Sequence, residues 1–325
     1  MDRQSCIVTG GAGFIGTHLL SSLNQTKRFN RIFVLDSKPP QVDFPGVVHI
    51  PCDLKQPLAV DISEPCHTCF HLAAVCKEPG YEWEEYFSVN YAGTVNLRDF
   101  AERIGIRNII FTSTMMVYRA GEQRCTEDAL TAPDTAYGMS KLLAELVLKE
   151  WGARSPQRRL RIVRPGVVFG KGESANYTRL YHALRKKRFV YVGRKSTVKG
   201  SIYVKDLVRF LEFLTDDPLG DSLYNLVYPE PLTIEDICTA MCEVFGFNSH
   251  IPVLPYRLAL LGGYVGEFLS QMGINTHIHH RRIEKLYNST DLTADRACKN
   301  GFRVAYPLRD ALRDWQKDCL PEDIY

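Results

Sequence analysis

The chain has 325 residues, of which 45% are hydrophobic and 24% charged, which is ordinary for a globular protein of one large or two modest domains. Its formal net charge of +3 is too small to indicate a nucleic-acid partner. No secretory signal precedes the first predicted strand, and no apolar run is long enough to span a bilayer. We therefore expect a cytoplasmic protein with free thiols.

The first predicted elements are a strand, a glycine-rich turn and a helix. The glycines of the turn, Gly10, Gly13 and Gly16, have the spacing that admits a pyrophosphate to a helix N-terminus. The next predicted strand ends in Asp36, about 20 residues further on, where a carboxylate accepts hydrogen bonds from an adenosine ribose. A carboxylate there repels a 2′-phosphate, so the two features favour NAD over NADP. The alternative is an ordinary glycine turn followed by a solvated acid.

Strand-like and helix-like segments alternate through the first half of the chain. Strands are predicted at 4–9, 31–36, 46–50, 68–72, 107–112 and 159–163, and helices at 14–24, 83–103 and 136–151. Such alternation predicts an α/β fold, a Rossmann-type doubly wound parallel sheet with helices on both faces. The functional loops are then expected at the carboxyl ends of the strands.

After about residue 165 the pattern becomes irregular. Helices are predicted near 175–187, 204–215, 232–245, 256–272 and 279–287, mixed with short strands. We interpret residues 1–165 as an NAD-binding domain, with a later segment at about 200–228 interleaved. Residues 166–325 are expected to form mainly a smaller C-terminal α/β substrate lobe.

The cysteine pattern predicts no metal site. Cys66 and Cys69 have a spacing found in zinc sites, but no second pair lies at the distance that such a site requires. The pair also runs into an apolar segment, so a buried strand is the better interpretation of these residues.

Two further segments carry candidate chemistry. The predicted strand at 107–112 leads into hydroxyl residues, of which Thr114 is placed to hydrogen-bond a substrate hydroxyl at the sheet edge. Tyr137 and Lys141 open a predicted helix four residues apart, so their side chains share one face. A nearby ammonium lowers the pKa of a phenol that is otherwise a poor base at neutral pH. The alternatives are a strand-end cap and a solvated lysine at a helix start.

With these features in place, the sequence resembles the extended short-chain dehydrogenase/reductases, in particular the NAD-dependent sugar epimerase/dehydratase family. The matching motifs follow one another in family order over most of the chain. They are Thr9–Gly16, Asp36, Cys52-Asp53-Leu54, His71-Leu72-Ala73-Ala74, Asn90, Ser113-Thr114 to Tyr118, Tyr137-x-x-x-Lys141, Arg164–Gly170 and Ile202–Leu207.

The resemblance implies roles for the residues at the matching positions. Thr114, Tyr137 and Lys141 form the implied catalytic triad, and Lys141 also holds the nicotinamide ribose. Asp53 is implied to contact adenine. The implied NAD-binding residues are Gly10, Gly13, Phe14, Ile15, Gly16, Asp36, Asp53, Leu54, Leu72, Ala73, Ala74, Asn90, Tyr137, Lys141, Pro165 and Val167.

The second half is similar to bacterial 4-epimerases that act on polyprenyl-diphosphate-linked N-acetylglucosamine. The likeness is greatest at 160–170, 189–204 and 254–264. Relatives that use UDP-sugars have an asparagine where this chain has Val167, and an arginine that grips the diphosphate where it has Lys199. A lysine cannot form the bidentate fork of an arginine. The substrate-binding residues implied by position are Thr114, Asn176, Lys199, Arg281 and Asn288.

The implied activity is a sugar 4-epimerase of bacterial surface polysaccharide (O-antigen) biosynthesis. It interconverts the N-acetylglucosamine and N-acetylgalactosamine configurations on polyprenyl diphosphate or UDP, through a transient 4-keto sugar. The alternatives are a 4-keto-sugar reductase on the same scaffold and, from another class, a non-catalytic NAD-binding regulator. A dehydratase is disfavoured, because Met115 follows Thr114 where that reaction needs a carboxylate pair.

Two assembly features are expected. Relatives pair through two helices, here 83–103 and 136–151, which predicts a homodimer. Basic residues interleaved with apolar ones at 179–199 suit the anionic inner membrane surface, and a solvated helix face is the alternative. The apolar stretch 256–272 is too short to span a bilayer, and we interpret it as a buried helix of the smaller lobe.

Overall fold

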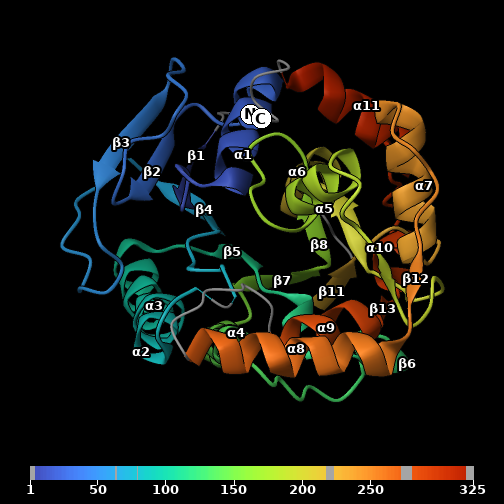
Figure 1. Cartoon of the computed structure of the whole chain (residues 1–325). Helices are drawn as coiled ribbons and strands as arrows, with labels where there is room; N and C mark the ends of the chain where they lie inside the picture. The colour runs from blue at the N-terminus through green and yellow to red at the C-terminus, as the bar shows by residue number, and fades with distance from the viewer. Residues whose placement is uncertain (1–3, 63, 79, 217–222, 272–279, 320–325) are drawn as a thin grey trace.

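The computed structural model describes residues 4–62, 64–78, 80–216, 223–271 and 280–319 (Figure 1). Their main feature is a seven-stranded sheet in the order β11-β7-β5-β4-β1-β2-β3, in which every neighbouring pair is parallel. The strands are β1 (Ser5–Thr9), β2 (Ile32–Asp36), β3 (Val47–Pro51), β4 (Cys66–His71), β5 (Asn108–Thr112), β7 (Arg159–Pro165) and β11 (Leu223–Leu226). The chain runs outward from β1 in both directions, so the predicted doubly wound Rossmann-type sheet is confirmed.

Helices cover both faces of this sheet because its strands present apolar residues alternately to each side. Val8 joins the core beneath α1 and α6, and Ile7 joins the core beneath α3 and α4. The four helices are α1 (Phe14–Thr26), α3 (Gly93–Ile104), α4 (Ala136–Ala153) and α6 (Val204–Asp216). The site therefore rests on strands that are buried on both faces, which holds their carboxyl ends in place.

The helix predicted at 83–103 is divided into three segments. It begins as α2 (Trp83–Tyr86), continues as the π-helix η1 (Phe87–Ala92) and ends as α3. A π-helical turn takes one more residue than an α-helical turn, so it shifts the side chains that follow around the axis. The hydrophobic periodicity of the sequence does not predict this insertion, and it lies where Asn90 enters the site.

The remaining described residues form helices and two-stranded pairs, most of them beyond the carboxyl ends of the sheet (Figure 1). The helices are α5 (Asn176–Arg185), α7 (Ile234–Phe245), α8 (Tyr256–Gln271), α9 (His280–Tyr287), α10 (Asp295–Lys299) and α11 (Leu308–Asp318). The parallel pairs are β8 (Val167–Phe169) with β10 (Ser201–Tyr203), β9 (Tyr191–Val192) with β12 (Val253–Leu254), and β6 (Gly121–Cys125) with β13 (Thr290–Leu292). A second apolar core around Phe169, Tyr177 and Trp315 holds α5, α7 and α11 together.

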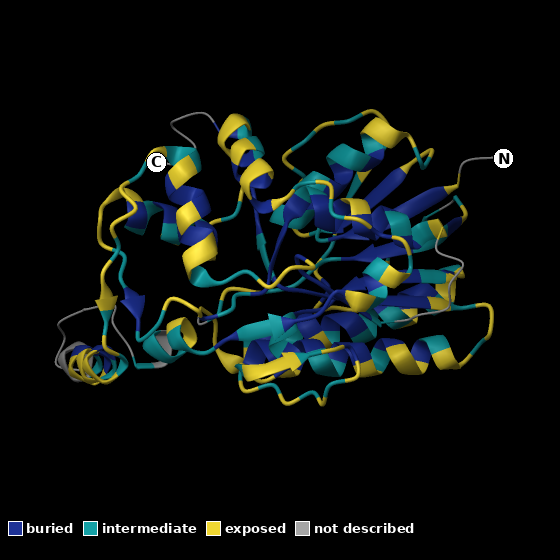
Figure 2. Cartoon of the chain, turned by 90° about the vertical axis from the view of Figure 1, so that its right-hand side faces the viewer, coloured by how far each residue is buried: buried dark blue, intermediate teal, exposed yellow. Residues whose placement is uncertain are grey.

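The interpretation of residues 256–272 as a buried helix is wrong. The helix is present as α8, but Leu258, Leu261, Tyr264 and Val265 along it are 50–60% exposed. Figure 2 shows α8 nearly end-on at the edge of the molecule, with exposed residues along its outer side. The apolar composition that suggested burial therefore faces solvent in the described chain.

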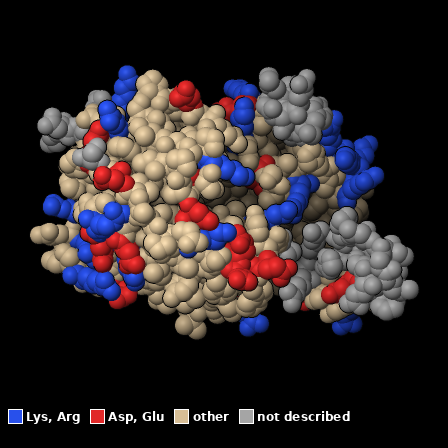
Figure 3. Space-filling model, turned by 90° about the vertical axis from the view of Figure 1, so that its left-hand side faces the viewer, with Lys and Arg blue, Asp and Glu red and all other residues tan. Residues whose placement is uncertain are grey.

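Charged side chains are intermixed on the face that carries β3 and α3. Figure 3 shows Lys and Arg next to Asp and Glu across this face. Arg98 contacts Asp99, and Lys55 lies between Asp53 and Glu85. These surface pairs partly cancel one another, in line with the small net charge of the whole chain.

Candidate active site

The glycine turn between β1 and α1 forms one end of the site. Gly10 has a φ of +72°, and a Cβ there would lie 2.5 Å from the Ala73 backbone nitrogen. A Cβ on Gly16 would lie 2.2 Å from the Gly10 carbonyl oxygen. On Gly13, by contrast, a Cβ would meet only that same oxygen, at 3.2 Å. The outer glycines close the turn, and Gly13 leaves room beside an α1 N-terminus that no side chain caps.

Asp36 lies at the end of β2, next to this turn. Its Oδ2 accepts a hydrogen bond from the Ala12 backbone nitrogen at 3.0 Å, and its Oδ1 accepts one from the Lys38 backbone nitrogen at 3.0 Å. A carboxylate offers about four acceptor positions, so two remain for ribose hydroxyls. The turn, the helix N-terminus and this oriented carboxylate together fit the adenosine diphosphate half of NAD.

The loop after β4 is held against the glycine turn by a buried histidine. His71 Nδ1 lies 2.7 Å from Thr9 Oγ1, and its Nε2 lies 2.9 Å from Thr94 Oγ1. Burial lowers the pKa of His71 well below its usual value, so the ring is neutral. Leu72 and Ala73 donate backbone hydrogen bonds to the Thr9 carbonyl and hydroxyl, at 3.1 and 3.3 Å. Ala74 follows in the same loop.

Asn90 joins this loop to α4. Its Oδ1 accepts a hydrogen bond from the Val75 backbone nitrogen at 2.9 Å, and its Nδ2 donates to the Val75 carbonyl and to Ser140 Oγ, both at 3.0 Å. These bonds use the buried side-chain amide to set the distance between two parts of the site. A direct contact of Asn90 with NAD stays a prediction.

Tyr137 and Lys141 lie one turn apart at the start of α4, which Thr135 caps by accepting a hydrogen bond from the Gly138 nitrogen at 3.1 Å. Both side chains are buried. Burial raises the pKa of the Tyr137 phenol, and hydrogen bonding with Thr114 acts in the opposite direction. Burial also lowers the pKa of the Lys141 amine, to about 7.

Thr114 reaches Tyr137 because two backbone segments touch. Thr114 caps the short 3₁₀ helix η2 (Met115–Val117), and its Oγ1 accepts a hydrogen bond from the Met116 nitrogen at 3.2 Å. A Cβ on Gly138 would lie 2.2 Å from the Met116 carbonyl oxygen, so α4 packs directly on η2. The structure thus brings together Thr114, Tyr137 and Lys141.

A buried ion pair that no sequence pattern predicts lies directly behind the lysine. Glu145 is one turn beyond Lys141 and accepts hydrogen bonds from Arg164 Nε at 2.8 Å and Nη2 at 2.5 Å. Ser113 Oγ donates to the same carboxylate at 2.6 Å, and Arg164 Nη1 donates to the Tyr118 hydroxyl at 2.7 Å. The negative charge of Glu145 favours the charged form of Lys141.

Cys76 is another neighbour that the sequence patterns leave out. It is exposed in the loop after β4, and its interaction with Tyr137 and Lys141 raises the pKa of both groups. The Tyr86 ring also lies near Tyr137, with ring centroids 6.2 Å apart. Within the part of the chain that the structure describes, no group of three or more His, Cys, Asp or Glu side chains is placed to hold a metal ion.

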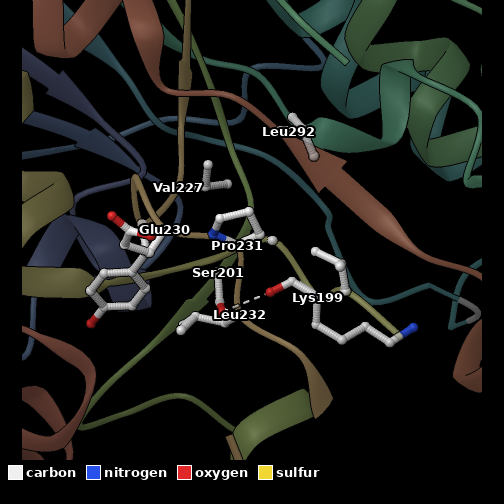
Figure 4. Close-up of a pocket in the computed structure, with 10 residues that line it drawn as sticks. Lys199, Ser201, Val227, Glu230, Pro231, Leu232 and Leu292 are labelled. Atoms are coloured by element: carbon white, nitrogen blue, oxygen red, sulfur yellow. Dashed lines mark hydrogen bonds between the residues drawn. The ribbon is translucent and has the colours of Figure 1, made fainter. Parts of the chain in front are cut away.

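Lys199 lines a small pocket with Ser201, Val227 and Leu232, but its ammonium points away from the pocket (Figure 4). Its Nζ donates to the carbonyls of Lys285 and Asn288, both at 2.7 Å. These carbonyls belong to the last turn of α9 and the residue after it, so Lys199 acts as a cationic cap of that helix. Burial lowers the pKa of Lys199 to about 8.

Two further residues expected to contact the substrate, Asn176 and Arg281, lie on α5 and α9. Asn176 is exposed at the first position of α5. The nearby Glu173 carboxylate already accepts hydrogen bonds from the backbone nitrogens of Ala175, at 2.6 Å, and Thr178, at 2.9 Å. Arg281 belongs to α9, and its side chain lies outside the described residues.

The remaining expected NAD contacts lie at strand ends. Pro165 ends β7 and Val167 begins β8, so both are at the carboxyl edge of the sheet. Asp53 and Leu54 follow β3, where Asp53 Oδ1 accepts a hydrogen bond from the Lys55 nitrogen at 3.0 Å. Phe14 and Ile15 form the first turn of α1. These residues therefore lie at or just beyond the carboxyl ends of strands of the parallel sheet, on the side where such folds bind ligands.

Comparisons with known proteins place this geometry in context. Residues 6–226 match the model of the NAD dependent epimerase/dehydratase family. Over 316 residues the chain is 31% identical to the N-acetyl-alpha-D-glucosaminyl-diphospho-ditrans,octacis-undecaprenol 4-epimerase of Escherichia coli O157:H7. The matched residues cover 95% of this chain and 93% of that protein.

Two solved structures share the fold. MoeE5 in complex with UDP-glucuronic acid and NAD is similar with a TM-score of 0.75 and 23% identity, over 98% of this chain and 100% of that chain. The UDP-glucuronic acid 4-epimerase from Bacillus cereus in complex with NAD is similar with a TM-score of 0.74 and 20% identity, over 97% and 99% of the two chains. At these identities the likeness establishes the architecture.

Proposed function

The chain belongs to the NAD-dependent epimerase/dehydratase family, and from this premise we propose that it is a 4-epimerase of diphosphate-linked N-acetylglucosamine. One observation carries the proposal. Thr114, Tyr137 and Lys141 meet at the same sheet edge as the glycine turn and Asp36. A base, a hydroxyl and a dinucleotide site at one edge are what reversible oxidation of a sugar hydroxyl requires.

We propose that the residues around the sheet edge hold NAD along its length. The N-terminus of α1 takes the pyrophosphate, Asp36 the adenosine ribose, Asp53 the adenine and Lys141 the nicotinamide ribose. When bound, NAD accepts a hydride from sugar C4 and later returns it. In this division residues 1–165, with 200–228 interleaved, form the NAD-binding domain, and 166–325 form mainly the substrate lobe.

Residues of the chain transfer the proton of the sugar 4-hydroxyl. Tyr137, as phenolate, takes the proton of the sugar 4-hydroxyl, and the Thr114 hydroxyl orients that oxygen. The hydrogen bond with Thr114 acts against the effect of burial on the pKa of Tyr137. We propose that the charged form of Lys141, one turn along α4, stabilises the phenolate further. After the 4-keto sugar has turned over in the pocket, Tyr137 returns the proton to the same oxygen. The reaction has no net oxidation, so one bound cofactor serves every turnover.

We propose polyprenyl diphosphate as the carrier, with UDP as the alternative. The 31% identity to an epimerase of an undecaprenol-linked sugar supports this choice. The ammonium of Lys199 is engaged by two backbone carbonyls where UDP-sugar enzymes place a diphosphate-binding arginine, so the chain departs there from the UDP-sugar pattern. Asn176, Arg281 and Asn288 remain the proposed contacts of the diphosphate and the sugar.

The test is turnover of each carrier separately. Purified protein is incubated with undecaprenyl-diphosphate-linked N-acetylglucosamine in detergent and, in parallel, with UDP-N-acetylglucosamine, and the released sugars are separated by chromatography. We expect N-acetylgalactosamine only from the lipid-linked substrate. Conversion of the UDP-sugar alone would contradict the proposed carrier. Conversion of neither, or a requirement for a stoichiometric supply of NADH, would contradict the proposed epimerase.

We also propose that the protein is a homodimer, paired through the outer surfaces of η1 and α4 and their neighbours. Trp83, Tyr91, Met139 and Leu146 expose 36–61% of their surface on these elements, which leaves an apolar area for a second copy to cover. Light scattering of the Leu146→Glu variant is expected to show a monomer. A wild-type monomer would contradict the pairing.

The last element of the proposal is the protein's place in the cell, the cytoplasm with peripheral association at the inner membrane surface. No helix in the described ranges is long and apolar enough to cross a membrane. A lipid-linked sugar is presented at the bilayer surface, so an enzyme that uses it must reach that surface. Fractionation of cells by sedimentation tests this placement, and full recovery in the salt-washed soluble fraction would contradict it.

A further inference from the structure

Helix α8 presents its large apolar side chains to solvent. Leu258, Leu261 and Val265 follow one another at intervals of three and four, so they lie on one side of the helix. Their exposed fractions are 58%, 60% and 50%, and Tyr264 beside them is 51% exposed. Figure 2 shows this helix at the outer edge of the molecule. An apolar face of this kind on a soluble domain marks a contact surface.

The opposite side of α8 carries small residues. Ala259, Gly263 and Gly266 are buried there. A Cβ on Gly263 would lie 2.8 Å from the Cα of His280, so α8 and α9 are in backbone contact. There is no space on this inner side for a leucine. The helix therefore cannot rotate to bury its apolar face within the same chain.

The charges of the hairpin formed by α8 and α9 suit an anionic surface. Arg257 and Lys285 are exposed on it. The two described acids of the hairpin are less exposed. Glu267 is paired with His280, 2.6 Å from its Nδ1, and Glu284 lies near the Tyr256 ring. An exposed basic run, residues 185–188, lies three residues before β9, which pairs with the β12 strand that leads into α8. Apolar side chains bordered by cations are the pattern of a helix that lies in the interface of an anionic membrane.

The hairpin is also joined to the substrate side of the molecule. The rings of Tyr256 and Tyr287 stack with centroids 4.1 Å apart, and Lys199 holds the end of α9 through its two carbonyl contacts. Gly193, which follows β9, fits against the Tyr287 ring, where a Cβ would come within 2.8 Å. A membrane in contact with α8 would therefore lie next to the residues that we propose hold the carrier.

We propose that α8 is the element by which the protein lies on an anionic bilayer, with Leu258, Leu261 and Val265 at the acyl boundary and the basic residues at the headgroups. With 16 residues the helix is about 24 Å long and lies in the membrane plane. The inference rests on the proposed function, because only a lipid-linked substrate requires the protein to work at a bilayer.

Flotation with lipid vesicles tests the proposal without depending on turnover. The full-length protein is mixed with vesicles of phosphatidylethanolamine and phosphatidylglycerol or with vesicles of phosphatidylcholine alone. We expect the wild type to float with the anionic vesicles, and the double variant Leu258→Gln/Leu261→Gln to lose at least about tenfold in binding. The matched control is Leu130→Gln, a leucine that is 88% exposed outside α8, and it is expected to bind like the wild type.

Two measurements separate the outcomes. Unchanged thermal unfolding and unchanged NAD content show that the double variant is folded. The proposal is overturned if the wild type does not bind anionic vesicles, or if the double variant binds them as well as the wild type. It is also overturned if the variant alters only the oligomeric state, because the face then belongs between copies of the chain. Failure of the proposed function appears separately, as absent epimerisation by wild-type protein in detergent.

Discussion

The catalytic edge of the sheet and the α8–α9 hairpin use opposite chemistry. At the sheet edge, polar and charged groups such as Lys141, Glu145 and Arg164 are buried and partnered. On the hairpin, leucines are exposed and the inner positions are small. Buried polar groups need fixed partners, so the first region is rigid and suited to a reaction common to the family. Exposed apolar groups are stabilised by contact with another apolar surface, so the second region is suited to the membrane contact that we propose for α8.

The largest effect is expected at the sheet edge. Tyr137→Phe removes the hydroxyl that exchanges the proton, and turnover should fall by about 10³-fold or more on any carrier. The protein should still contain NAD, measured after release with denaturant, because the ring and Lys141 remain. Near wild-type epimerisation by this variant would show that Tyr137 is not the proton-transferring residue. The sheet edge would then lose its assignment as the catalytic region.

The second prediction concerns the stability of that edge. Glu145→Gln leaves Arg164 buried without its carboxylate, and the free energy of unfolding should fall by about 3–5 kcal/mol. Denaturant unfolding measures the change. The matched control is Glu150→Gln on the exposed side of the same helix, where the partner is the exposed Arg154, and no measurable change is expected. Equal stability of the two variants would show that the ion pair does not hold the edge together.

The third prediction moves to the hairpin. Lys199→Ala leaves the carbonyls of Lys285 and Asn288 without their donor, and the free energy of unfolding should fall by about 1–3 kcal/mol. Because these contacts position α9 rather than the reacting atoms, KM for the lipid-linked sugar should rise severalfold with kcat little changed. The control is Lys195→Ala, an exposed lysine paired with Glu235. A fall in kcat alone would place Lys199 among the reacting groups instead.

The last prediction is a pH dependence of stability. The pKa of Lys141 is about 7 in the fold, against about 10.4 for an ordinary lysine. Between these values the unfolded chain holds a proton that the folded chain lacks, so this group makes the free energy of unfolding rise with pH. The excess stability of Lys141→Met over wild type should therefore be largest below pH 7 and shrink toward pH 10. Denaturant unfolding of NAD-free protein measures this excess stability. An excess that does not change with pH would contradict the lowered pKa of Lys141.

The sheet edge was predictable from sequence where the signal is local. The glycine turn, Asp36 at a strand end and the four-residue spacing of Tyr137 and Lys141 each follow from one element and its turn. The pair of Glu145 with Arg164 was not, because it joins a helix to a strand and depends on how the two pack. The π-helical turn at Asn90 was not predictable either, because one inserted residue does not change the composition of a helical segment.

The hairpin was the least predictable region. An apolar stretch of helical length predicts burial by default, and only the packing of Gly263 against His280 shows which side of α8 faces inward. The role of Lys199 depends on carbonyls more than eighty residues away. Contacts of that range are set by the whole fold, so a motif comparison identifies the position and says little about its partner.

The most direct test of the central claim follows the atom at sugar C4. Lipid-linked N-acetylglucosamine carrying deuterium at C4 is incubated with the protein without added NADH, and the product is examined by mass spectrometry. An epimerase that returns the same hydride gives N-acetylgalactosamine that keeps the deuterium at C4. Loss of the deuterium, or no product until NADH is supplied, would contradict the account.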